Sequence, residues 1–137
     1  MPVYPYLVFN GNCLEAVQFY AEVFDAELQP MMRFNDMPEN PEYKIPEEAK
    51  EFIMHTQLGI NGTNVMFSDQ MPGMPYTQGN SISLAFVQSN ENEIRTYFSR
   101  LKETGQVNME LRSSSWSRLY GQVTDRFGVI WQFNQDE

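Results

Sequence analysis

The only histidine of the chain is the residue whose chemistry is easiest to test. His55 lies within the segment 51–58, where bulky and β-branched residues predict a strand. Histidine changes its charge near neutral pH, so His55 could be a general base or a hydrogen-bond partner of a ligand. The alternative is a sheet histidine bonded to a neighbouring strand, because a lone histidine without a carboxylate partner is weak evidence for catalysis.

Two further reactive side chains have competing structural interpretations. Asp69 ends the predicted strand 63–69 and could orient His55, but a turn cap is the commoner role of an aspartate beside a Pro-Gly loop. Cys13 falls at the start of a predicted helix, where the helix dipole would lower a thiol pKa. The chain has no second cysteine for redox chemistry, so Cys13 is interpreted as incidental and a reducing compartment is expected.

An aromatic pair near the C-terminus could contact a ligand. Trp116 and Tyr120 could close a binding surface as a stacking wall, whereas plain packing or a dimer contact is the alternative that we favour. Arg112 and Arg118 are the nearest candidates to bind an anionic group, or they form surface ion pairs. No glycine-rich phosphate loop and no G-x-S-x-G nucleophile elbow occurs in the sequence.

The elements that must position these residues follow an order that repeats. We predict strands at 4–10, 27–35, 51–58, 63–69, 80–88, 106–112, 119–125 and 129–134. One helix starts at Asn12, with Glu15 completing a capping box, and a second helix runs from Ser89 to a C-cap at Gly105. The order strand, helix and three strands therefore occurs twice. It indicates a single α+β domain over 1–137, with βαβββ modules at 1–70 and 79–137 whose sheets form a curved mixed trough.

Alternation along the predicted strands assigns side chains to the trough. His55 and Gln57 face it from the third strand, Ser81 and Ser83 from the fifth, and Gln132 from the last. This lining is mostly neutral and polar with apolar patches, which suits a small organic ligand better than a free metal ion.

Composition narrows the classes of partner and compartment. The chain has 137 residues and a formal charge of −9, which disfavours nucleic acid as a partner. Its start lacks the basic and apolar pattern of a signal peptide, and no apolar run reaches the roughly 20 residues that span a bilayer. We therefore expect a cytoplasmic protein without a membrane partner.

Several motifs together carry a family resemblance. The run Tyr6–Phe24 (YLVFNGNCLEAVQFYAEVF) resembles the opening of the vicinal oxygen chelate superfamily, which includes glyoxalase I, bleomycin-resistance proteins and extradiol dioxygenases. The segments Ile53-Met54-His55, Phe67–Gly73, Trp116–Gly121 and Asp125–Trp131 are similar to its PhnB-like branch. The resemblance spans nearly the whole chain and implies the glyoxalase/bleomycin-resistance fold and a homodimer. Asp25 stands where the family usually has glycine, a departure that affects a helix cap.

The resemblance also implies where a divalent metal would be held. Metal-dependent members use His and Glu from four strands, and the matching positions here are Pro5, Phe67, Ser81 and Gln132. Proline and phenylalanine cannot coordinate a metal, so no metal or other cofactor is expected. A different site formed by His55, Asp69 and Gln132 is a disfavoured alternative. The branch sometimes carries a demethylubiquinone methyltransferase label, but no glycine-rich cofactor loop follows a strand in this sequence.

The sequence thus predicts a metal-independent protein that binds a small molecule. The ligand-contacting residues would be Gln57, Phe67, Asp69, Ser81, Ser83, Trp116, Tyr120 and Gln132. The alternative is a lyase, isomerase or dioxygenase of the same fold with His55 as the acid/base group, with or without a divalent metal. A purely structural or protein-binding role is least favoured.

Overall fold

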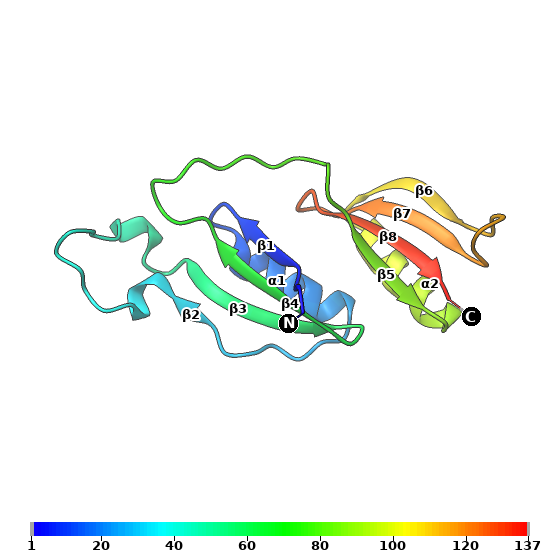
Figure 1. Ribbon diagram of the computed structural model, residues 1–137, viewed down its shortest axis with the longest axis horizontal. Helices are drawn as coiled ribbons and strands as arrows, with labels where there is room; N and C mark the ends of the chain where they lie inside the picture. The colour runs from blue at the N-terminus through cyan, green and yellow to red at the C-terminus, as the bar shows by residue number, and fades with distance from the viewer. Residues whose placement is uncertain (1, 137) are drawn as a thin grey trace. The chain divides into compact units, whose positions relative to one another are not determined.

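Two compact units make up the computed structural model, which describes residues 2–136 (Figure 1). The units comprise residues 1–77 and 78–137, and each contains a four-stranded mixed sheet with one long helix. The first unit consists of β1 (Tyr6–Phe9), α1 (Cys13–Val23), β2 (Met32–Arg33), the 3₁₀ turns η1 (Phe34–Asp36) and η2 (Glu47–Ala49), β3 (Ile53–Ile60) and β4 (Thr63–Asp69). The second consists of β5 (Leu84–Gln88), α2 (Glu91–Lys102), β6 (Gln106–Arg112), β7 (Tyr120–Thr124) and β8 (Ile130–Gln135). The predicted α+β class with two βαβββ modules is confirmed.

The sheets have the same topology in both units. The strand orders are β1-β4-β3-β2 and β5-β8-β7-β6. The first strand of each unit pairs in parallel with the last, and the other pairings are antiparallel. Because the first strand lies beside the last, its partner is reached only after the helix and two further strands.

Aromatic side chains fill the core between each helix and its sheet. In the first unit, Tyr20 of α1 stacks on Phe67 with ring centroids 5.8 Å apart, and Phe9 lies 6.4 Å from Phe67. In the second unit, Phe133 lies 5.5 Å from Phe98 of α2 and 5.2 Å from Phe86. Burying a large aromatic side chain contributes roughly 2–3 kcal/mol. Each helix therefore covers one face of its own sheet.

Several predicted strands are shorter in the structure than the sequence suggested, and β1 covers only Tyr6–Phe9 of the expected 4–10. The strand expected at 27–35 is reduced to Met32–Arg33, because Pro30 has no N–H to give to a ladder. The carbonyl oxygen of Pro30 instead accepts a hydrogen bond from the Thr56 hydroxyl at 3.1 Å. The strand expected at 80–88 begins at Leu84, which pairs with Trp131. Parallel continuation before Leu84 would meet the turn around Gly128, whose φ is +86°, so no ladder forms there.

The helix ends differ from the expected caps. Asn12 makes no side-chain capping bond to α1, so the predicted capping box is wrong, and the carboxylate of Asp69 accepts the adjacent N–H groups instead. Gly105 does not adopt a positive φ; it is required because a Cβ there would collide with the Thr124 carbonyl oxygen. Asp25 does adopt the left-handed conformation after α1, with φ +52°, and the N–H of Ala26 bonds back to Ala21 at 2.9 Å.

The hairpin between β3 and β4 is tighter than the predicted turn at 59–62. Asn61 and Gly62 have φ values of +51° and +82°, as a two-residue type I′ turn requires. Strand β3 consequently runs on to Ile60 before the chain reverses.

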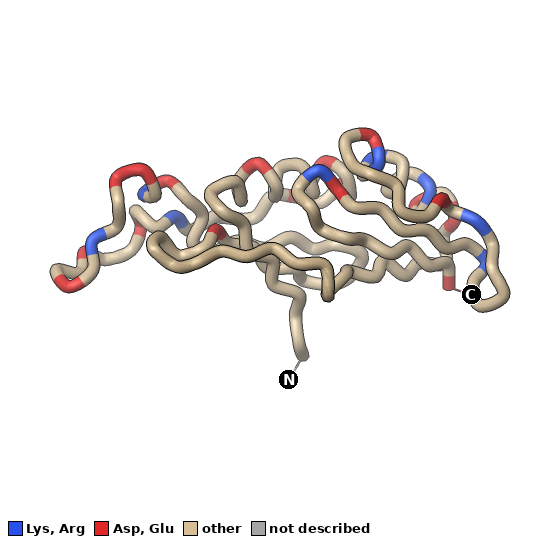
Figure 2. The backbone as a smooth tube through the Cα atoms, turned by 90° about the horizontal axis from the view of Figure 1, so that it is seen from above, with Lys and Arg blue, Asp and Glu red and all other residues tan. Residues whose placement is uncertain are grey.

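Acidic segments occur on both units, as the red stretches in Figure 2 show. No helix among residues 2–136 is long and apolar enough to cross a bilayer.

Candidate functional site

The helix-free face of the first sheet carries the histidine. Cross-strand partners share a face, so the pairs Tyr6↔Met66 and Gln57↔Met66 place these three side chains on one side of the sheet. His55, two residues before Gln57, lies on the same side. The Tyr6 hydroxyl oxygen is 3.2 Å from His55 Nδ1, and the two ring centroids are 5.8 Å apart. The pair forms a hydrogen-bonded phenol–imidazole group on an uncovered face.

Gln57 is occupied by a neighbour on this same face. Its Oε1 accepts a bond from Asn64 Nδ2 at 2.8 Å. The amide nitrogen of Gln57 makes no bond to another described residue, so it is the part of this side chain that a ligand could engage.

Phe67 and Asp69, expected among the ligand-contacting residues, lie on the opposite, helix-covered face. Phe67 is fully buried against Tyr20, and Asp69 is 3% exposed. Their register partners Leu7 and Phe9 share that face. The physical reason is strand parity: positions 67 and 69 alternate with Met66, which points away from α1. Asp69 therefore cannot share a face with His55.

Asp69 is instead an anchor for three separate stretches of backbone. Its Oδ1 accepts bonds from the N–H groups of Gly11 at 2.8 Å and Cys13 at 2.9 Å, and its Oδ2 accepts one from Ile53 at 2.9 Å. Burial raises the pKa of Asp69, although the three N–H donors act to lower it. The carboxylate also stands at the N-terminus of α1, where negative charge is favourable.

Cys13 has the opposite character to the one that its helix position suggested. Its side chain is completely buried, and burial together with the nearby Asp69 carboxylate raises the pKa of the thiol. The lowering by the helix dipole is thus outweighed by desolvation, and the thiol stays neutral at ordinary pH.

The helix-free face of the second sheet brings three predicted residues together. The Tyr120 hydroxyl donates to Gln132 Oε1 at 2.8 Å, and Gln132 Nε2 donates to the Ser83 hydroxyl at 2.7 Å. The chain of bonds crosses β7, β8 and the residue just before β5. Each of these three side chains is half-buried, so the network is held firmly yet remains reachable.

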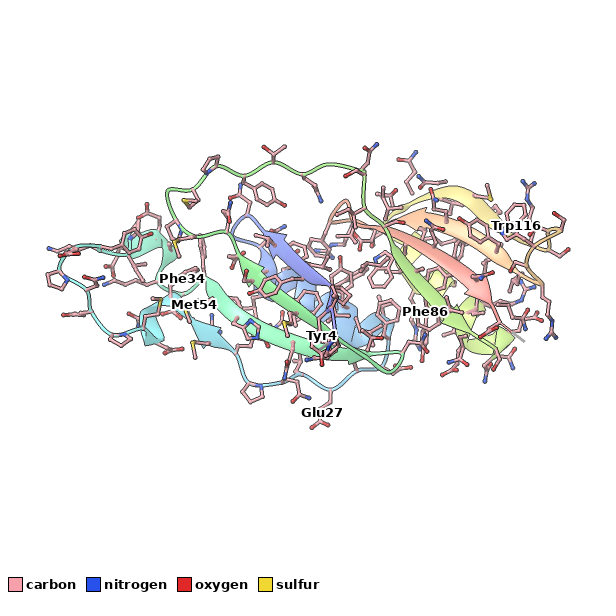
Figure 3. All side chains as sticks on the ribbon, in the orientation of Figure 1. Tyr4, Glu27, Phe34, Met54, Phe86 and Trp116 are labelled. Atoms are coloured by element: carbon pink, nitrogen blue, oxygen red, sulfur yellow. The ribbon has the colours of Figure 1, made fainter. Side chains whose placement is uncertain are left out.

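Trp116 stands beside this network, in the connection between β6 and β7 (Figure 3). Its ring lies edge-on to Tyr120, with centroids 5.9 Å apart, and its side chain is 69% exposed. Ser81 lies before β5 in an exposed segment, and no hydrogen bond joins it to the described residues. The structure therefore separates Ser81 from the group formed by Ser83, Tyr120 and Gln132.

Two residues of the uncovered faces were missing from the expected site. Leu7 faces the helix together with its partner Phe67. Tyr6 is the next residue along the strand, so alternation indicates that it points away from the helix. Asn134 pairs with Tyr120 across the sheet, and its Oδ1 is buried without a hydrogen-bond partner. Strand parity indicated the face of Asn134, but its unpaired oxygen depends on packing that the sequence does not display.

The residues at the metal positions of related folds do not fit a cation. Pro5 and Phe67 have no donor atom in their side chains, and Gln132 is already bonded through both amide atoms. Among residues 2–136, no three His, Cys, Asp or Glu side chains gather in a way that could hold a metal ion. These positions therefore offer a divalent cation no set of ligands.

The doubled module defines the class of this protein as the glyoxalase/bleomycin-resistance fold. The fosfomycin resistance protein FosX of Listeria monocytogenes superimposes with a TM-score of 0.67 over 100% of this chain and 94% of its own, at 12% identity, which shows the fold alone. The model of the family described as 3-demethylubiquinone-9 3-methyltransferase matches residues 2–134. The chain belongs to this family, the PhnB-like branch of the fold, which confirms the resemblance seen in the sequence.

Similar proteins cover essentially the whole chain. Protein YjdN of Escherichia coli is 33% identical over 98% of this chain and 95% of its own length. The crystal structure of PA1353 from Pseudomonas aeruginosa has a TM-score of 0.85 at 36% identity, covering 99% of each chain. A putative 3-demethylubiquinone-9 3-methyltransferase, PhnB protein, from Bacillus cereus has a TM-score of 0.75 at 29% identity, covering 99% of this chain and 100% of its own.

Proposed function

We propose that this protein binds a small organic molecule without a metal, on the helix-free face of the β5-β8-β7-β6 sheet. The observation that carries the proposal is the bonded chain Tyr120–Gln132–Ser83, which fixes three neutral polar groups on one face. Fixed polar groups in a partly apolar surface are what orient small ligands in proteins.

Two neighbours of the network strengthen this proposal. Trp116 offers an exposed aromatic ring at the edge of the network. Asn134 offers an acceptor oxygen that no described group satisfies, and leaving such an oxygen unpaired costs about 1–3 kcal/mol. That oxygen is buried, so a ligand donor would recover part of this cost only where the Asn134 side chain turns outward on binding.

The two tryptophans give a direct assay of binding. Trp116 is 69% exposed, whereas Trp131 is 3% exposed and donates through Nε1 to Asp125 at 2.9 Å. A compound that binds this face should change the emission of Trp116 and leave that of Trp131 nearly unchanged. Compounds extracted from the protein as purified, identified by mass spectrometry, would be titrated first.

Matched variants decide whether the signal comes from the proposed face. Tyr120→Phe removes the first bond of the network and is expected to weaken binding by about tenfold. Gln29→Ala changes an exposed glutamine of the other unit and should leave the affinity unchanged. If Tyr120→Phe binds every active compound as tightly as the unaltered protein, the proposed face is wrong.

The metal-independent part of the proposal has its own test. The protein would be incubated with zinc, nickel, manganese or iron(II), freed of excess ion by gel filtration and analysed for bound metal. We expect no stoichiometric uptake. One ion per chain that survives gel filtration, or ligand binding that requires an added ion, would overturn metal independence.

An enzymatic role is the second candidate, and the Tyr6–His55 contact is the observation that favours it. The imidazole is held 3.2 Å from a phenol hydroxyl, an arrangement that can relay a proton. It predicts that His55→Gln abolishes turnover of a substrate while Tyr6→Phe shifts the pH profile. The family description names a methyl transfer, so S-adenosylmethionine belongs among the compounds tested, and turnover with it would contradict a binding-only role.

A homodimer remains a prediction from the family resemblance, and light scattering of the purified chain would check it.

A further inference from the structure

One arginine lies on the proposed binding face in the same row as Tyr120. Arg112 ends β6 and is the register partner of Tyr120, which in turn is the partner of Asn134. Register partners point to the same side of a sheet, so Arg112 shares the helix-free face with the bonded network. The row across the strands therefore runs from a cation at β6 to an unpaired acceptor at β8.

The guanidinium of Arg112 has no partner within the part of the chain that the structure describes, residues 2–136. Most other cations of this acidic protein are engaged: Arg33 faces Glu51, Arg95 bonds Glu91 at 2.7 Å and Lys50 bonds Glu47 at 2.8 Å. With a formal charge of −9, acidic partners are abundant. A cation left free on this face, in a chain with twice as many acids as bases, is available to an anionic ligand.

Two aromatic rings lie on the same hairpin as this cation, one of them its register partner Tyr120 and the other next to Tyr120. Trp116 and Tyr120 lie with ring centroids 5.9 Å apart, and Trp116 is largely exposed. A flat apolar body can pack against these rings while its charged group reaches Arg112. Guanidinium groups bind carboxylates through two parallel hydrogen bonds, which fixes the orientation of a planar acid.

We propose that the ligand of this face is a planar organic carboxylate, with Arg112 as its anion anchor and the Trp116–Tyr120 pair as its apolar wall. This inference rests on the proposed function and adds the charge and shape class of the molecule bound. It also gives the β6–β7 hairpin a binding role in addition to the packing role.

Benzoate and benzamide are the probes, because they have the same size and shape and differ in charge. Binding would be followed by NMR titration of the ¹⁵N-labelled full chain, using the indole N–H signal of Trp116 and the backbone amide of Tyr120. We expect benzoate to bind about tenfold more tightly than benzamide at low salt, as a charge-assisted pair to arginine allows. The preference should shrink as sodium chloride is added.

The decisive variant is Arg112→Gln, which leaves a polar but shorter side chain and removes its charge. It should reduce the preference for benzoate to less than about twofold. Arg95→Gln is the matched control, since it removes the same charge from the exposed side of α2, where Arg95 pairs with Glu91. The preference should survive in that variant.

The outcomes separate this inference from the proposed function. Benzamide binding as tightly as benzoate, or a benzoate preference that persists in Arg112→Gln, overturns the carboxylate inference and leaves the face itself as a binding surface. If neither probe shifts the Trp116 or Tyr120 signals, the inference is also overturned, and the fluorescence titration with co-purified compounds decides the proposed function separately.

Discussion

Replacing the buried Asp69 should strongly destabilise the first unit, and more than replacing an exposed aspartate of that unit. Asp69→Ala leaves three backbone N–H groups without an acceptor, those of Gly11, Cys13 and Ile53. The bonds to Cys13 and Ile53 are buried, whereas that to Gly11 is partly buried. A hydrogen bond to a charged group contributes about 1.5–3 kcal/mol, and a buried donor left unpaired costs about 1–3 kcal/mol.

The expected size of the effect follows from these bonds. Two buried donors at about 2 kcal/mol each, with a smaller amount for the solvated one, give a loss of about 4–5 kcal/mol. The raised pKa of Asp69 shows that burying the carboxylate is itself costly, so the net loss should be smaller than this sum. Asp69→Asn keeps an acceptor for two donors and should lose about half as much.

The assay must report on the first unit. Both tryptophans lie in residues 78–137, so fluorescence follows the second unit, and far-UV circular dichroism in urea follows both. Amide exchange in β3 and β4 should accelerate in Asp69→Ala. Asp36→Ala is the matched control, because the exposed Asp36 accepts a single bond, from Arg33 N–H at 2.8 Å. If both alanine variants lose less than about 1 kcal/mol, the three bonds to Asp69 do not anchor the first unit.

Three other predictions concern single side chains. Because the pKa of Cys13 is raised in the folded protein, the folded state keeps a proton that the unfolded chain releases, so stability should fall by up to about 1.4 kcal/mol per pH unit above pH ~8.5. Urea titrations at several pH values should show this slope reduced in Cys13→Ala. Gly105→Ala should cost about 1–3 kcal/mol, because its Cβ would meet the Thr124 carbonyl oxygen, whereas Gly59→Ala has open space and should be nearly neutral. Asp25→Gly should leave the melting temperature nearly unchanged, because the relief of strain at φ +52° is offset by the loss of an interaction that Asp25 makes. A shift of more than about 5 °C in either direction would contradict this balance.

Much of the fold could be predicted because local sequence patterns determine its helices and strands. The helical spacing of apolar residues located α1 and α2, and alternation along strands assigned Ser83, Gln132 and His55 to the uncovered faces. The repeat of element order then implied two like modules. Strand limits were less accurate. Pro30 cuts β2 short, and β5 begins only where its partner β8 begins, because pairing is a property of the folded sheet rather than of the segment.

The site was only partly visible for a related reason. Phe67 was assigned to the site by its position in the family motif. The alternation of β4 turns this residue toward α1, where its buried ring stabilises the core. Tyr6 and Arg112 are candidates because of residues on other strands. Tyr6 contacts His55, 49 positions along the chain, and Arg112 pairs with Tyr120, 8 positions along. Such partners can be named only once the register is known.

An aspartate at the end of a strand illustrates how a functional and a structural role can be told apart. The sequence suggested Asp69 as a ligand contact or an orienting group for His55, with a turn cap as the commoner role, and both of its oxygens are used by backbone donors from three segments. Asp125 behaves alike: it accepts from the N–H groups of Phe127 and Val129 and from the indole of Trp131. A buried carboxylate whose two oxygens both accept bonds from its own fold acts as an anchor for the backbone rather than as a ligand contact. By the same criterion, the groups with unused capacity, Arg112 and Asn134, are where a bound molecule should be sought.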